Sequence, residues 1–262
     1  MESAHSLTPA AGLSRRHPNP VLVLGIETAT DVCAVALLLD GAVVFARSQN
    51  EPRRHAERLA PMLAEALGSA RSFRSEMETQ GVIDGIAVSA GPGSYTGLRI
   101  GVSSAKGVAL ALGVPIAGVS TLAALAAAAA GSIQTGVIVA AMHARADEWY
   151  VATFEAQPVE LDDDRGSVSS VRERSEPAIL AKTDLIALLE STSGTLVVPS
   201  QDADPSPNIP NTHRVSPSAV HVARIGANLL REGLVCDLES FEPTYLREFV
   251  PRRAKRGIFN SE

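Results

Sequence analysis

Cysteine is scarce in this sequence, which has only Cys33 and Cys236 among its 262 residues. They show no CxxC spacing and no paired framework, so a disulfide scaffold is excluded and a reducing compartment, the cytoplasm, is indicated. A long hydrophobic run is also missing. The longest apolar stretch, residues 121–131, is rich in alanine and far shorter than the roughly 20 residues that cross a bilayer. We therefore predict a soluble protein in which this stretch forms a buried helix.

Positive charge is in deficit, since 23 lysines and arginines stand against 29 acidic residues and the net charge is −6. Such a surface repels phosphate backbones, so independent binding to nucleic acid is disfavoured. One basic cluster lies near the C-terminus. It is either a solvated tail or a local contact with RNA phosphates inside a larger complex. Its members are Arg247, Arg252, Arg253, Lys255 and Arg256.

The overall composition, with 45 % hydrophobic and 20 % charged residues, is that of an average globular protein. Residues 1–18 contain Arg15 and Arg16 but lack the apolar run of a secretory signal. We expect a disordered extension there.

Apolar runs and turn signals predict the order β-β-β-α-β-α-β over the first half of the chain. Asp40-Gly41 tolerates positive φ and joins the second and third strands as a hairpin. The first helix is expected to open near Glu51-Pro52, to kink at Pro61 and to stop at Gly68, before an irregular stretch at residues 69–81. The predicted strands are residues 21–27, 32–39, 42–48, 83–89 and 115–119, and the second helix ends at Leu112 before Gly113.

The second half repeats this order of elements without repeating the residues. Ser216 is expected to cap a helix that begins at Pro217 and ends at Arg231. Residues 161–176 and 200–214, rich in Asp, Ser and Pro, are expected to be exposed loops. The other predicted elements are strands at residues 136–143, 148–155, 168–171 and 195–198, and a helix at residues 183–189.

Two tandem units of this kind predict an α/β protein with an actin-like (ASKHA) fold, in which two duplicated β-β-β-α-β-α lobes face each other. A single doubly wound sheet is the alternative. We place the N-terminal lobe at residues 19–118, the C-terminal lobe at residues 119–250 and a basic tail at residues 251–262.

A glycine-rich segment, Gly91-Pro-Gly-Ser-Tyr-Thr-Gly97, leaves a predicted strand and opens a helix, where proteins often bind phosphate. Leu98 and Arg99 replace the Lys-Ser/Thr of a Walker A loop. Thr96 stands where a dinucleotide fingerprint needs its third glycine. We favour a structural glycine turn over a conventional phosphate loop.

Small residues line one face of the helix that follows this segment. Gly97, Gly101 and Ala105 recur at every fourth position, and two glycines inside a helix cost about 2 kcal/mol relative to alanine. Close approach of another helix would compensate for this cost. From spacing alone, that helix belongs either to this chain or to a partner.

No catalytic constellation is found in the sequence. It has no HxxxH, HExxH or GxSxG pattern, and neither cysteine has a histidine companion, so no metal site is predicted. Glu27-Thr28 stands where a kinase of the actin type carries an aspartate and a glycine. An actin-fold small-molecule kinase or ATPase is therefore kept as an alternative function. Its candidate nucleotide-binding residues are Glu27, Thr28, Gly93 and Ser94.

Four segments together resemble the TsaB (YeaZ) family, which serves the biosynthesis of threonylcarbamoyladenosine at adenosine 37 of tRNA. They are Gly91 to Gly101, Arg54 to Leu59 with Pro61, Ile26-Glu27-Thr28, and Pro243 to Arg247. The resemblance spans roughly residues 21–250 and implies an actin-like fold. It also implies a scaffold without catalysis of its own that binds and activates TsaD, the subunit with metal and catalytic residues.

The resemblance further implies that TsaE, an ATPase, is a partner and that the chain contacts tRNA only through the complex. It implies no intrinsic cofactor, and it allows ATP or ADP to bind at the interface with TsaD. In the family, the two helices of the N-terminal lobe pack against their equivalents in TsaD or in a second TsaB copy, so the isolated chain is either a monomer or a homodimer. The interface residues implied by position are His55, Leu59, Met62, Leu63, Tyr95, Gly97, Leu98, Arg99, Gly101, Val102, Ala105 and Lys106.

One departure from the family pattern lies after the first strand of the second lobe. Related chains commonly read Asp-Ala-Arg there, whereas this chain reads His143-Ala144-Arg145. An older interpretation of such sequences, a metallopeptidase-like protein, has no metal ligands to support it.

Overall fold

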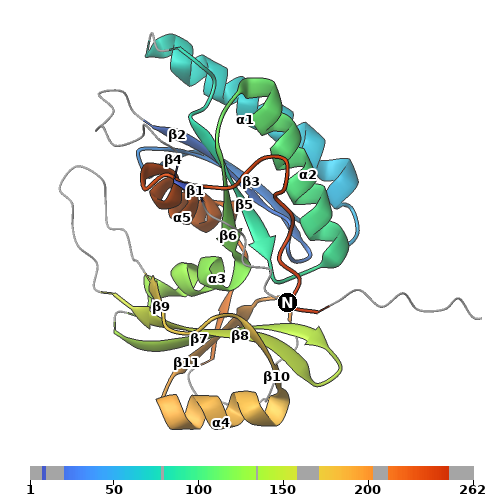
Figure 1. Cartoon of the computed structure of the whole chain (residues 1–262), viewed down its shortest axis with the longest axis vertical. Coiled ribbons are helices and arrows are strands. Elements are labelled where there is room, and N and C mark those ends of the chain that lie inside the picture. The colour runs from blue at the N-terminus through green and yellow to red at the C-terminus, as the bar shows by residue number, and fades with distance from the viewer. Residues whose placement is uncertain are drawn as a thin grey trace, which may run out of the picture.

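Two mixed α/β lobes make up the molecule, and each is built on its own sheet (Figure 1). The computed structural model describes residues 8–9, 21–77, 80–133, 135–157, 171–202 and 212–247. The first lobe has three strands followed by alternating helices and strands, and the second lobe follows a similar order, with four strands before α4 (Lys182–Thr192) and two strands between α4 and α5 (Ala219–Arg231) in the described residues. The predicted duplicated actin-like fold is confirmed, and the alternative of a single doubly wound sheet is wrong.

The first sheet has the strand order β4-β3-β2-β5-β6. Its first three strands form antiparallel hairpins, whereas β5 and β6 run parallel to β2 because a helix precedes each of them. Strands β2, β3 and β5 are buried almost throughout, as expected when helices cover both faces of a sheet. The bounds are β2 (Leu22–Glu27), β3 (Val32–Leu39), β4 (Ala42–Asn50), β5 (Gly85–Gly91) and β6 (Ile116–Ser120).

Helices α1 (His55–Glu76) and α2 (Tyr95–Leu112) lie on one face of this sheet, and α5 (Ala219–Arg231) lies on the other (Figure 1). Helix α5 approaches β2 closely. A Cβ atom on Gly25 would lie 2.3 Å from the backbone oxygen of Ala219, so glycine is needed at this position.

The second sheet has the strand order β10-β8-β7-β11-β12, with β9 also paired to β8. Helix α3 (Thr121–Ala130) covers one face and α4 (Lys182–Thr192) covers the other. The alanine-rich stretch is thus a buried helix, as predicted. The strands are β7 (Gly136–Arg145), β8 (Glu148–Ala156), β9 (Val171–Glu173), β10 (Ala178–Ala181), β11 (Thr195–Pro199) and β12 (Thr212–Val215).

The two lobes exchange a helix. Helix α3 follows a strand of the first sheet but packs on the second, and α5 follows a strand of the second sheet but packs on the first. After α5 the chain stays with the first lobe, where Phe241 is buried in the core. Helix α5, which we placed in the C-terminal lobe at residues 119–250, thus packs on the first sheet through its apolar face.

Part of the N-terminal extension forms a strand. Strand β1 (Thr8–Pro9) pairs antiparallel with β13 (Leu234–Val235), so the prediction of disorder over residues 1–18 is wrong at these two residues. The remainder of that extension lies outside the described residues. The same holds for the tail at residues 251–262, and hence for Arg252, Arg253, Lys255 and Arg256 of the basic cluster.

Helix α1 does not stop at Gly68 but continues to Glu76, through most of the stretch that we expected to be irregular. Its last turns are held by Arg74, whose buried guanidinium forms an ion pair with Asp84 just before β5. The same carboxylate accepts the backbone N–H of Leu22 at 2.6 Å. A glycine in a helix costs only about 1 kcal/mol, so this anchor outweighs it.

Two smaller expectations also differ from the structure. Helix α5 is capped by Ser218, whose hydroxyl accepts the N–H of Val220 at 3.2 Å, and not by Ser216. The predicted loop at residues 200–214 ends in strand β12, and the strand expected at residues 168–171 is β9, three residues long.

The anchor of α1 gives a first prediction. Asp84→Ala should lower the free energy of unfolding by about 2 kcal/mol, because it removes an acceptor from a buried guanidinium and from a backbone N–H. Hydrogen exchange should also accelerate in residues 69–76. Urea denaturation and exchange mass spectrometry measure the two effects.

Asp40→Ala is the matched control for this substitution. The carboxylate of Asp40 accepts the N–H of Val21 at 3.0 Å at the same end of β2, but in an exposed turn. Equal losses in the two variants, with unchanged exchange in α1, would contradict the role of Asp84 as an anchor.

Candidate functional site

The glycine-rich segment after β5 packs tightly against the turn between β2 and β3. The N–H of Ser94 donates to the backbone oxygen of Ala29 at 2.7 Å. A Cβ atom on Gly93 would lie 2.4 Å from that same oxygen. The Ser94 hydroxyl accepts the N–H of Gly97 at 3.2 Å, which caps α2 and explains why the helix begins at Tyr95. The loop is thus filled by the chain's own carbonyl groups.

Glu27 holds the β2–β3 turn from inside. It is fully buried, and its carboxylate accepts the hydroxyl of Ser89 at 2.5 Å and the N–H of Ala29 at 2.7 Å. Burial raises the pKa of Glu27 to about 7, and the two hydrogen bonds only partly oppose this shift. Burial, with Glu27 as a secondary cause, also raises the pKa of Cys33 to about 11.

The structure brings the four candidate nucleotide-binding residues together. Glu27 and Thr28 are fully buried in the turn, Gly93 is half-buried and Ser94 is exposed. Glu27, Gly93 and Ser94 each contact Ala29, Glu27 also accepts the Ser89 hydroxyl, and Ser94 also caps α2 at Gly97, as expected for a structural turn. The hydroxyl of Thr28 is buried and has no hydrogen-bond partner.

The stripe of small residues on α2 faces the interior of its own lobe. A Cβ atom on Gly97 would lie 2.1 Å from the backbone oxygen of Thr28, and one on Gly101 would lie 2.1 Å from the Thr28 hydroxyl. Ala105 is fully buried in the same lobe. Gly97 and Gly101 therefore pack against the β2–β3 turn and Ala105 packs in the core of the same lobe, which favours packing within the chain over contact with a partner at these three residues.

Most of the other predicted interface residues are also buried in the first lobe. They are buried within this lobe in the free chain, and contact of these residues with a partner stays a prediction. These residues are His55, Leu59, Met62, Leu63, Leu98 and Val102.

The remaining three predicted interface residues lie at the surface, on α2. Arg99 is exposed, and Tyr95 and Lys106 are half-buried. The guanidinium of Arg99 lies over the ring of Tyr95 and donates to its hydroxyl at 2.7 Å.

Exposed small residues also occur on another side of α1 and α2. On α1 they recur every fourth residue beside the exposed Glu57, Pro61 and Glu65, and on α2 they surround Leu110, which is 74 % exposed. The two helices lie side by side on the same side of the sheet (Figure 1). We call this surface the α1–α2 face. Its residues are Ala56, Ala60, Ala64 and Gly68 on α1, and Ser103, Gly107, Leu110 and Ala111 on α2.

Two glycines of the α1–α2 face have no explanation inside the chain. A Cβ atom on Gly68 or on Gly107 would meet no atom within 4 Å. Each glycine costs about 1 kcal/mol in a helix relative to alanine, and at these positions no packing within the chain offsets that cost. Sequence reasoning missed this face because it considered small residues on the second helix alone. The regular spacing of Ala56, Ala60, Ala64 and Gly68 was the available signal.

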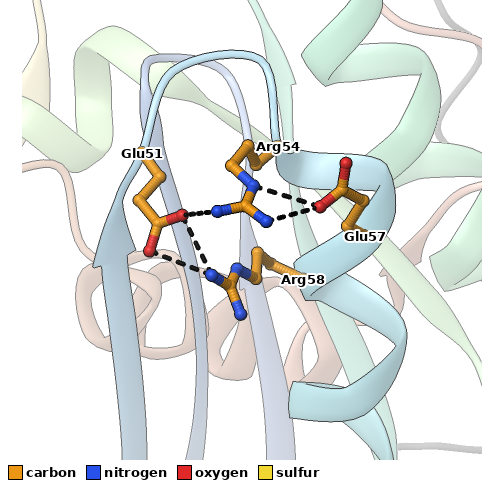
Figure 2. A network of polar contacts seen from close by, with 4 residues as sticks. All are labelled: Glu51, Arg54, Glu57 and Arg58. Atoms are coloured by element: carbon orange, nitrogen blue, oxygen red, sulfur yellow. Dashed lines mark hydrogen bonds and ion pairs between the residues drawn. The ribbon is translucent and has the colours of Figure 1, made fainter.

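A network of four charged side chains orders the N-terminal end of the α1–α2 face (Figure 2). Arg54 precedes the helix, offers no side-chain cap, and donates instead to Glu51 at 2.8 Å and Glu57 at 2.9 Å. Arg58 donates to both oxygens of Glu51. These bonds, with that of Arg58 the largest cause, lower the pKa of Glu51. The four side chains alternate in sign, so together they fix the connection from β4 into α1.

His143 makes local contacts in the second lobe. The backbone N–H of His143 donates to the carboxylate of Asp202 at 2.8 Å, and the His143 ring lies edge-on to the ring of Trp149. Asp202 thus supplies a carboxylate at the end of β7, next to His143. Burial is the main cause that raises the pKa of Asp202.

The described residues include neither a metal-binding cluster nor a membrane-spanning helix. No group of three or more His, Cys, Asp or Glu side chains that could hold a metal ion lies among them. None of the helices in this part of the chain is long and apolar enough to cross a membrane.

Comparison with known proteins gives a consistent family. The sequence profile of TsaD, described as tRNA N6-adenosine threonylcarbamoyltransferase, matches residues 48–176. The tRNA threonylcarbamoyladenosine biosynthesis protein TsaB of Escherichia coli is 30 % identical over 237 residues, which cover 87 % of this chain and 95 % of that protein. The chain belongs to the TsaB family. The predicted resemblance is confirmed.

Other TsaB relatives agree with this assignment. TsaB of Haemophilus influenzae is 33 % identical over 140 residues, which cover 53 % of this chain and 56 % of that protein. The solved structure of YeaZ from Pseudomonas aeruginosa matches with a TM-score of 0.61 and 26 % identity, over 87 % of this chain and 100 % of that chain. The family fold therefore extends over both lobes.

The contrast between the two small-residue stripes on α2 of this TsaB-family chain can be tested. Gly101→Ala should destabilise the protein by about 2 kcal/mol, because the new methyl group overlaps the hydroxyl of Thr28. Gly107→Ala, on the exposed side, should be neutral or stabilise by up to about 1 kcal/mol. Urea denaturation of both variants measures the difference. Equal stability in the two would show that the buried face of α2 is assigned incorrectly.

Buried Glu27 should make stability depend on pH. Its folded pKa lies above the unfolded value of 4.5, so the folded protein keeps a proton that the unfolded chain loses, and stability falls as pH rises from about 4.5 to about 7. Glu27→Gln mimics the protonated form and removes this dependence. Between pH 5 and pH 8 the wild type should lose on the order of 3 kcal/mol relative to the variant. Denaturation curves at both pH values test this, and parallel pH profiles would refute it.

Proposed function

We propose that this chain is a scaffold subunit in the biosynthesis of threonylcarbamoyladenosine at adenosine 37 of tRNA, where it binds and activates a TsaD-type catalytic subunit. Membership of the TsaB family supports the pathway. The observation that carries the docking site is the α1–α2 face, with Gly68 and Gly107 open to the outside and Leu110 exposed. Small side chains let a second pair of helices approach closely, and Leu110 supplies an apolar anchor.

The proposal places catalysis on TsaD because the ASKHA loops of this chain are committed to internal packing. Glu27 is buried and bonded to Ser89 and Ala29, and the glycine loop is filled by the β2–β3 turn. The chain would act by binding. Binding to one face of the catalytic subunit would shift the conformational equilibrium of that subunit towards its active conformation. The size of the shift equals the difference in binding free energy between the active and inactive conformations.

The further partners follow from the same proposal. TsaE would join the complex, and ATP or ADP would bind at the interface with TsaD instead of within this chain. With a net charge of −6, the chain would contact tRNA through the complex. In the absence of TsaD, a second copy of the chain would dock on the α1–α2 face, because the same small-residue surface suits both partners.

Leu110→Glu tests the docking site. The substitution places a charge at the centre of an interface that buries it, and should weaken binding to TsaD at least about tenfold. Because Leu110 is 74 % exposed in the free chain, the variant should keep its melting temperature. Isothermal titration calorimetry with the purified TsaD of the same organism measures the affinity.

Ser191→Glu is the matched control, since it adds the same charge at an exposed position of α4, on the outer side of the second lobe. It should leave the affinity unchanged. A folded Leu110→Glu variant that binds TsaD as tightly as the wild type would disprove docking on the α1–α2 face. Loss of self-association in Leu110→Glu, seen by analytical ultracentrifugation, would show that the second copy uses the same face.

A further inference from the structure

The chain that follows α5 runs along the first lobe beside α2 and then reaches the second lobe (Figure 1). We call residues 236–247 the strap. Beyond β13 these residues form no helix or strand in the described part of the chain. Twelve residues without regular secondary structure adopt a single conformation only if tertiary contacts hold them, because each ordered residue loses conformational entropy.

The strap is anchored firmly to the first lobe at three points. The N–H of Cys236 donates to the oxygen of Ile116 in β6 at 2.8 Å, and the N–H of Thr244 donates to the oxygen of Ala90 in β5 at 2.7 Å. Between them the ring of Phe241 is buried in the core, against Gly118. These contacts make the strap part of the first lobe, and a buried phenylalanine makes them costly to break.

Two further contacts join the strap to α2. The ammonium of Lys106 donates to the backbone oxygens of Glu239 at 3.1 Å and Phe241 at 3.0 Å. At the start of the helix the rings of Tyr95 and Tyr245 pack with their centroids 4.9 Å apart. The strap therefore follows α2 back towards its N-terminus and ends next to the glycine loop.

The last described residue of the strap reaches across to the second lobe. The guanidinium of Arg247 donates to the carboxylate of Glu148, the first residue of β8, at 2.6 Å. The same carboxylate oxygen accepts Arg145 at 3.2 Å, but Arg145 belongs to β7 of the same sheet. The hydrogen bond from Arg247 is the largest cause of a lowered pKa at Glu148. Both partners are about one third exposed, so this contact is weaker than those of the strap with the first lobe.

We propose that the strap holds the two lobes in one arrangement, and that the ion pair between Arg247 and Glu148 is its releasable latch. The strength of the contacts decides which end opens. The end at the first lobe is held by a buried aromatic ring and backbone hydrogen bonds, whereas the end at the second lobe is held by an ion pair that is about one third exposed. Opening the latch frees the second lobe to move relative to α2.

The latch also bears on partner binding, and this step rests on the proposed function. Lys106 and Tyr95 belong to the helix whose outer side forms part of the α1–α2 face. A partner that binds the strapped arrangement more tightly would keep the latch closed, and a closed latch would by linkage raise the affinity of the partner by the same factor.

Arg247→Gln opens the latch and Arg145→Gln is its control, because the two arginines share one carboxylate oxygen but only Arg247 joins the lobes. Spin labels are attached at the exposed residues Ser72 on α1 and Ser191 on α4. Pulsed electron paramagnetic resonance then measures the distance between the two lobes. Arg247→Gln should broaden the distance distribution, and exchange of the Thr244 amide should rise about two- to fivefold. Arg145→Gln should leave both unchanged. Distributions as narrow in Arg247→Gln as in the wild type would overturn the proposal.

Calorimetry with TsaD separates this proposal from the proposed function. If Arg247→Gln broadens the distances and weakens binding about two- to fivefold, while Leu110→Glu abolishes binding without broadening them, the latch and the docking site are distinct and coupled. If Arg247→Gln broadens the distances but leaves the affinity unchanged, the coupling to the partner is wrong. If the wild type does not bind TsaD, the proposed function fails, and the distance measurement on the free chain still tests the latch.

Discussion

The arrangement of the first lobe depends on the contact between the β2–β3 turn and the start of α2. The backbone oxygen of Ala29 accepts the N–H of Ser94, and Thr28 fits against two glycines of the helix. Buried Glu27 fixes the turn from the other side. Because no side chain fits between turn and helix, α2 is held rigidly against the sheet, and its opposite side is presented to the outside in one orientation. The glycine loop thus packs against the β2–β3 turn and sets the orientation of α2.

Because the glycine loop is filled by internal packing, the proposed function assigns partner binding to this chain and catalysis to TsaD. Gly97 and Gly101 are satisfied by packing within the chain, whereas Gly68 and Gly107 are not. A protein that keeps two exposed glycines in adjacent helices accepts a loss of stability that a docked partner can compensate.

The sequence was sufficient to predict the duplicated order of elements, because burial on both faces leaves continuous apolar runs in β2, β3 and β5, and clear turn signals separate them. It was not sufficient where long-range contacts decide the outcome. Arg74 carries α1 past Gly68 by bonding Asp84, ten residues further on, and the apolar face of α5 does not reveal which of two sheets it covers. The orientation of α2 was ambiguous for a related reason. Two stripes of small residues occur on one helix, and only the position of Thr28 distinguishes the buried stripe from the exposed one.

The exchange of helices between the lobes gives the strap its significance. Since α5 returns the chain to the first lobe, the strap starts there, and within the described residues it reaches the second lobe at Arg247. The α3 and α5 pair lies between the sheets and can act as a pivot, because two packed helices slide more easily than a sheet bends. The latch lies away from that pivot, so its contact can restrict the angle between the lobes. It does so although an ion pair that is about one third exposed is weak. A small energy at the strap would be enough to bias the lobes, which is what a scaffold needs if its partner is to respond to its conformation.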